Sequence, residues 1–85
     1  MTHLNLSNNL IQSLDVFNVK DSLNFLLELD LSNNKISELS PIQLRCLKKI
    51  NLCQNKIVSC ERFEGHSTLE TLELRRNELS SLKGI

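Results

Sequence analysis

One pattern of eleven residues, which occurs four times in this chain of 85 residues, limits the possible folds more than any other feature. It reads L-x-x-L-x-L-x-x-N-x-L, where another large apolar residue can replace a leucine. Its asparagines lie 25, 21 and 22 residues apart, at Asn9, Asn34, Asn55 and Asn77. Further apolar residues follow each asparagine by five and by eight positions, at Leu14, Leu39, Cys60 and Leu82 and at Phe17, Ile42, Phe63 and Ile85. Repetition at this period predicts a solenoid, in which every repeat is one coil and neighbouring coils share an apolar core.

The pattern also predicts the secondary structure of each coil. The L-x-L part of the pattern has one apolar residue on each side of a polar residue. This alternation is typical of a short β-strand whose alternate side chains face the interior. We expect four parallel strands on the concave face, over residues 3–7, 28–32, 49–53 and 71–75. Only about a dozen residues remain for each return, so the convex face should hold turns, 3₁₀ segments and short helical turns. The expected fold is an α/β solenoid with repeats at residues 1–25, 26–46, 47–68 and 69–85, the last of them incomplete.

The asparagine of each repeat follows from the turn after the strand. There the chain bends inward, and each buried backbone group without a partner would cost roughly 1–3 kcal/mol. An amide side chain both donates and accepts hydrogen bonds, so it can satisfy such groups within a coil and between coils. We therefore interpret Asn9, Asn34, Asn55 and Asn77 as a structural ladder.

Composition argues against several classes of function. Ten Lys and Arg balance ten Asp and Glu, so bulk charge indicates neither nucleic acid nor an anionic membrane as a partner. Cys46, Cys53 and Cys60 are seven residues apart but fall at three different positions of the repeat, which argues against a shared metal site. An odd number of scattered thiols suits a reducing, intracellular and cytoplasmic setting. No pattern supplies a catalytic nucleophile, acid or base, or a cofactor site, and His66 is interpreted as a half-buried histidine with a backbone partner.

The candidate binding residues are the outward positions of the predicted strands. These positions form a polar concave face that is acidic at its centre and basic at one rim. The residues assigned to protein binding are Glu28, Asp30, Lys49, Asn51, Glu73, Arg75 and Arg76. The face has no aromatic residue, although Trp, Tyr and Arg dominate many protein interfaces. The alternative is that Glu28 and Lys49 only neutralise each other across neighbouring strands.

The chain resembles the short, 22-residue class of leucine-rich repeats found in protein phosphatase 1 regulatory proteins and in axonemal and ciliary proteins. The likeness is strongest over residues 69–85, LETLELRRNELSSLKGI, which include the Gly84-Ile85 pair. It covers the whole chain and implies the fold more strongly than any particular partner.

The resemblance implies an intracellular adaptor that binds a partner protein, in a ciliary, axonemal or other cytoskeletal assembly. The alternative is a regulatory segment of a larger enzyme or phosphatase regulator whose activity lies outside these residues. No polar cap precedes the first repeat or follows the last, although a solenoid needs one at each end. We therefore expect a slice of a longer array, with flanking repeats or a neighbouring chain over both ends.

Overall fold

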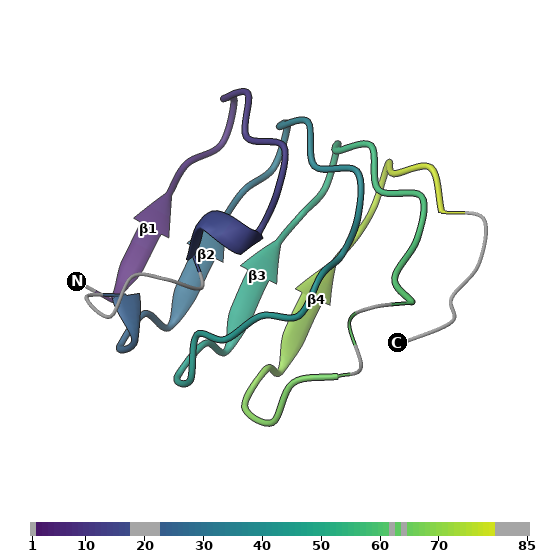
Figure 1. The fold of residues 1–85 in the computed structure, drawn as a ribbon. Helices are drawn as coiled ribbons and strands as arrows, with labels where there is room; N and C mark the ends of the chain where they lie inside the picture. The colour runs from purple at the N-terminus through teal and green to yellow at the C-terminus, as the bar shows by residue number, and fades with distance from the viewer. Residues whose placement is uncertain (1, 18–22, 62, 64, 80–85) are drawn as a thin grey trace.

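The structure, a computed structural model, describes residues 2–17, 23–61, 63 and 65–79. Four short strands form one sheet: β1 (His3–Asn5), β2 (Glu28–Asp30), β3 (Lys49–Asn51) and β4 (Thr71–Glu73). All neighbouring pairs are parallel, and the strands lie in chain order. A return leads from each strand to the next, so the chain winds as a solenoid with the sheet along one side (Figure 1). The predicted solenoid of four parallel strands is confirmed.

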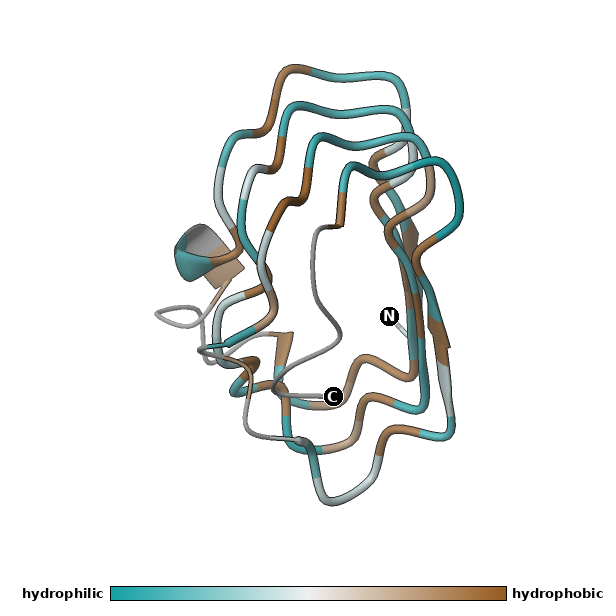
Figure 2. Cartoon of the chain, turned by 90° about the vertical axis from the view of Figure 1, so that its right-hand side faces the viewer, coloured by the Kyte–Doolittle hydropathy of each residue, from teal (hydrophilic) through white to brown (hydrophobic). Residues whose placement is uncertain are grey.

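The core lies between the sheet and the returns. Figure 2 shows apolar residues recurring at the same places in successive coils. The repeat residues of the two middle coils are buried almost completely: Leu26, Leu29, Leu31, Ile36, Leu47, Ile50, Leu52 and Ile57. Their counterparts in the two end coils are only partly buried: Leu4, Leu6, Ile11, Leu69, Leu72, Leu74 and Leu79. The difference arises because a middle coil packs against neighbours on both sides and an end coil packs on one side only.

The strands are shorter than the sequence predicted, and an Asx turn follows each of the first three. In each of these turns an aspartate or asparagine Oδ1 accepts a hydrogen bond from the backbone N–H two residues later. The donors are Ser7, Ser32 and Cys53, the acceptors are Asn5, Asp30 and Asn51, and the distances are 2.9, 2.9 and 3.0 Å. In β2 and β3, the Ser32 and Cys53 N–H groups are thereby diverted from hydrogen bonding with the preceding strand, which ends the regular strand.

The returns contain 3₁₀ geometry, as expected. The 3₁₀ helix η1 (Asp15–Phe17) follows β1, and Phe17 N–H donates to Leu14 O at 3.1 Å. Phe63 N–H makes the matching contact to Cys60 O at 3.0 Å. Both phenylalanines are buried, so the 3₁₀ turns bring large side chains under the convex face. Met1, Leu82, Gly84 and Ile85 of the predicted repeats, and residues 20–22 of the long first return, lie outside the described residues.

The turn after each strand places one residue in the left-handed region. The four residues there are Asn8 (φ 60°), Asn33 (φ 54°), Gln54 (φ 57°) and Arg76 (φ 61°). Asparagine tolerates this conformation, whereas other side chains with a Cβ are penalised by about 1–2 kcal/mol. Of these four residues, only Arg76 was among the predicted binding residues, and the repeat pattern did not predict the backbone strain at any of them.

Replacing Gln54 by asparagine should therefore stabilise the fold by about 0.5–1 kcal/mol, because the strain at φ 57° is relieved. Urea unfolding followed by circular dichroism measures the change. Gln12→Asn is the control, since Gln12 is exposed and has an ordinary negative φ, and it should leave the stability unchanged. A lower midpoint for Gln54→Asn would contradict the strain argument.

Candidate functional site

The outward side chains of the four strands form one polar surface, which we call the sheet face. It consists of His3, Asn5, Glu28, Asp30, Lys49, Asn51, Thr71 and Glu73. These residues project outward because side chains alternate along a strand, and the alternate positions Leu4, Leu29, Ile50 and Leu72 belong to the core. Strand register aligns the outward residues in two rows, led by His3 and Asn5 on β1.

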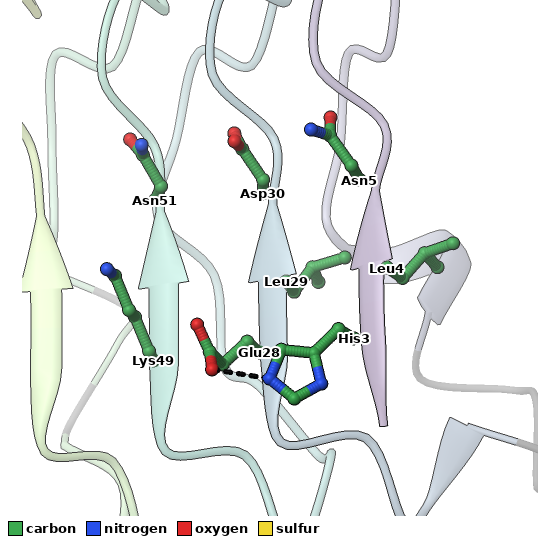
Figure 3. A pocket seen from close by; sticks show the side chains of 8 residues that line it. All are labelled: His3, Leu4, Asn5, Glu28, Leu29, Asp30, Lys49 and Asn51. Atoms are coloured by element: carbon green, nitrogen blue, oxygen red, sulfur yellow. Dashed lines mark hydrogen bonds and ion pairs between the residues drawn. The ribbon is translucent and has the colours of Figure 1, made fainter. Parts of the chain in front are cut away.

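An open hollow of about 260 Å³ lies on the sheet face over β1, β2 and β3. Six polar side chains line the hollow, together with Leu4 of β1 and Leu29 of β2 (Figure 3). Four of the predicted binding residues line it, namely Glu28, Asp30, Lys49 and Asn51. His3 and Asn5 complete the polar lining, although neither was among the predicted binding residues. Their signal was present in the sequence, because both head the same rows as the assigned residues.

Glu28 pairs with histidine and not with lysine. His3 Nε2 and Glu28 Oε2 are 2.6 Å apart, and His3 Nδ1 lies 2.9 Å from Thr2 Oγ1. A neutral imidazole that donates from Nε2 and accepts at Nδ1 satisfies both contacts. The ammonium of Lys49 makes no ion pair or hydrogen bond with another described residue. Glu28 and Lys49 therefore form no direct ion pair, and the ammonium of Lys49 can contact a ligand in the hollow.

The second row is held in place by the Asx turns. One oxygen of Asp30 is occupied by the Ser32 N–H, and the oxygen of the Asn51 amide is occupied by the Cys53 N–H. The other carboxylate oxygen of Asp30 and the amide nitrogen of Asn51 bond no other described residue. Side chains fixed through one atom offer the second atom to a ligand with little loss of rotamer entropy.

The remaining predicted residues lie at the other end of the sheet face. Arg75 Nη2 is 3.7 Å from Glu73 Oε1, and the Arg75 side chain is 83% exposed. Arg76 is exposed and occupies the left-handed turn position after β4. None of the three lines the hollow. The structure thus divides the predicted site into a hollow over β1–β3 and a basic rim beside β4.

The repeat asparagines Asn34, Asn55 and Asn77 form hydrogen bonds between successive coils. In the second coil, Asn34 Nδ2 donates to Leu31 O at 2.9 Å and to Leu6 O of the preceding coil at 3.1 Å. Its Oδ1 accepts the Ile11 N–H at 3.1 Å. Asn55 and Asn77 repeat these contacts with the second and third coils. Every such asparagine therefore reaches back to the coil before it, and this ladder keeps the strands of the sheet face in register.

His66 and the cysteines have structural surroundings. Half-buried His66 bonds Leu44 O through Nε2 at 3.0 Å and accepts the Leu69 N–H at Nδ1 at 3.1 Å, which matches the expected backbone partner. Burial raises the pKa of the Cys60 thiol, because desolvation disfavours the thiolate. Among the described residues, no three His, Cys, Asp or Glu side chains are close enough together to hold a metal ion. Within the same residues, no helix is both long and apolar enough to cross a bilayer.

Comparison with known proteins agrees with this geometry. The family described as Leucine Rich Repeat matches residues 25–47, which include the whole second strand and its asparagine. An uncharacterized leucine-rich repeat-containing protein of Schizosaccharomyces pombe is 42% identical over 72 residues, with 80% of this chain covered. The chain spans only 12% of the length of that relative. No solved structure matches significantly. The repeat pattern, the parallel sheet and these matches together identify the chain as a leucine-rich repeat solenoid.

Proposed function

We propose that the chain is a protein-interaction adaptor that holds a partner protein on its sheet face. Leucine-rich repeats generally mediate protein–protein interaction, which supports the proposal. The observation that carries it is the hollow over β1–β3, where Lys49 and one oxygen of Asp30 are left without partners among the described residues. A partner with both an acidic and a basic group can pair with them.

The construction of the sheet face supports binding in preference to catalysis. Its residues stand on strands that are fixed by the asparagine ladder, and rigid elements position binding groups better than loops do. His3 and Glu28 form a close pair, but no Ser, Thr or Cys side chain lines the hollow with them as a nucleophile. Acid–base groups without a reacting partner are better suited to recognition.

The basic rim gives the sheet face a second contact region. Arg75 is mostly exposed and only loosely paired with Glu73, so an acidic partner group can reach its guanidinium. The hollow and the rim together offer separated charges of both signs, which favours a specific docking orientation.

A second candidate function is regulatory. The chain spans 12% of the length of its fungal relative, so the sheet face can serve as one segment of a larger polypeptide whose activity lies elsewhere. The ciliary or cytoskeletal setting implied by the resemblance, and the intracellular location, stay separate predictions that depend on the identity of the partner.

Exchanging the two charges of the rim tests the proposal. Glu73→Lys combined with Arg75→Glu keeps an ion pair at this position, so folding should be unchanged while the face presented to a partner is reversed. We expect capture of the specific partner to fall about five- to tenfold, because rim charges chiefly set the association rate and orientation. Affinity capture with quantitative mass spectrometry measures the loss.

A matched exchange outside the sheet face is the control. Lys56→Glu with Glu61→Lys alters two exposed charges, on the turn beyond β3 and on the return, and should keep the captured proteins unchanged. Equal capture by both double variants would count against binding through the rim. If Lys49→Glu also had no effect, the sheet face would be excluded as the binding surface.

A further inference from the structure

We propose that the hollow over β1–β3 recognises a pair of neighbouring charges on the partner protein, with a basic side chain held over β2 and an acidic side chain held over β3. The inference rests on the proposed function and deepens it, because it names the chemistry of the partner surface. Both strands belong to the two middle coils of the solenoid, and all the residues involved lie in the described part of the chain.

The outward side chains of β2 are both carboxylates. Glu28 and Asp30 lie on one face of the strand, and both line the hollow. One oxygen of each is occupied: Glu28 Oε2 lies 2.6 Å from His3 Nε2, and Asp30 Oδ1 accepts the Ser32 N–H at 2.9 Å. Glu28 Oε1 and Asp30 Oδ2 bond no other described residue. β2 therefore offers two positioned acceptors, which a guanidinium or an ammonium can bind.

The outward side chains of β3 offer donors instead. Lys49 brings an ammonium that makes no ion pair or hydrogen bond with another described residue. The Oδ1 of Asn51 accepts the Cys53 N–H at 3.0 Å, so the Nδ2 of the same amide is left as a donor. An ammonium and an amide nitrogen on one face of a strand can bind the two oxygens of a carboxylate. β3 is therefore the position for the acidic group of the partner.

Strand register places the acceptors and the donors side by side. Glu28 is aligned with Lys49, and Asp30 is aligned with Asn51 (Figure 3). Neighbouring strands lie about 4.8 Å apart. Side chains three or four positions apart on a helix, or opposite each other in a sheet, are separated by a similar distance of about 5 Å. The partner charges that fit the hollow are therefore neighbours on one surface element.

The charges of the hollow also fix the orientation of this pair. Two carboxylates outnumber the single ammonium, because His3 is neutral when it donates to Glu28 and accepts from Thr2. The basic group of the partner is therefore the more strongly attracted of the two. In the reversed orientation, an acidic group would face the carboxylates of β2 and a basic group would face Lys49, so like charges would meet at both positions.

Random peptides displayed on phage supply the probe for the test, with the whole chain as the target. Selection should enrich peptides in which Arg or Lys stands within four residues of Asp or Glu. One enriched peptide is then synthesised, and fluorescence anisotropy measures its dissociation constant. Asp30→Asn removes the charge but keeps Oδ1 for the Ser32 N–H, and Lys49→Met keeps most of the aliphatic stem. Each variant should weaken binding about five- to tenfold.

Matched variants outside the hollow are the controls. Asp15→Asn changes an exposed carboxylate in η1, and Lys48→Met changes a lysine whose side chain is 60% exposed. Neither residue lines the hollow, so both variants should leave the dissociation constant unchanged. Circular dichroism confirms that each variant is folded.

Double-mutant cycles between the peptide and the chain then assign each contact. Replacing the basic residue of the peptide by glutamine should weaken binding to the unmodified chain about five- to tenfold, but binding to Asp30→Asn at most about twofold. Replacing the acidic residue by glutamine should show the same relation with Lys49→Met.

The inference would be overturned by a selection that enriches no peptides with such charge pairs. Peptide and chain substitutions whose effects are independent in both cycles would also overturn it. The proposed function would stand in either case, because capture of the partner protein by the rim variants tests it separately.

Discussion

Replacing Leu52 by alanine should unfold the chain or leave it only marginally folded. Leu52 is 0% exposed in the third coil, where it packs between the neighbouring coils on either side. Removing such a side chain costs about 2–5 kcal/mol, because transfer free energy is lost and a cavity remains. A domain of this size has a total stability of only about 5 kcal/mol, so the loss is close to the whole margin. Urea titration followed by circular dichroism measures the free energy of unfolding.

Leu10→Ala is the control for this prediction. Leu10 carries the same side chain but is 77% exposed, so its truncation should change the stability of the single chain by less than about 0.5 kcal/mol. If both substitutions had the same small effect, the coils would not share one continuous core. The assignment of Leu52 to the buried core of the middle coils would then be wrong.

Replacing Asn55 by alanine should have the second largest effect. Asn55 is 5% exposed, and its amide donates to Leu31 O and Leu52 O, both at 3.0 Å, while its oxygen accepts the Ile36 N–H at 3.1 Å. Alanine would leave these buried backbone groups without partners. At about 1–3 kcal/mol for each buried group, with partial relaxation, we expect a total loss of about 3–5 kcal/mol.

Asn9→Ala is the control for this prediction. It distinguishes the stabilisation from hydrogen bonds between coils from the local preference of the turn for asparagine. Asn9 occupies the same position in the first coil, but it is exposed, and among the described residues it bonds its own coil alone, at Leu6 O and Ser7 O. Its replacement should cost about 1 kcal/mol or less, since water can satisfy the released carbonyls. Equal losses for Asn9→Ala and Asn55→Ala in thermal melts would refute the argument that contacts between coils carry the stabilisation.

The candidate site followed from the sequence only in part. The period placed Glu28, Asp30, Lys49 and Asn51 on one face, and these four residues do line one hollow. The partner of Glu28 did not follow from the period. Both neighbouring strands offer a residue beside it, and the geometry of the side chains selects His3 over Lys49.

The strand ends show a similar limit. The sequence predicted five-residue strands, but the side chains of Asp30 and Asn51 take the Ser32 and Cys53 N–H groups that would have extended the hydrogen bonding between strands. A polar residue in a strand can point to solvent or fold back on its own backbone, and sequence periodicity is the same in both cases.

The sequence by itself determined the number of coils, their parallel strands, the residues of the core and the place of the asparagine in each turn. These follow from the spacing of apolar and amide side chains, because every coil must bury the same positions against its neighbours. The tertiary structure alone decided that Asn55 is buried and Asn9 exposed, that Gln54 and Arg76 lie in the left-handed region, and that Glu28 bonds His3. The physical reason is that identical repeats acquire different surroundings once they are stacked, since burial and pairing depend on the coils on either side.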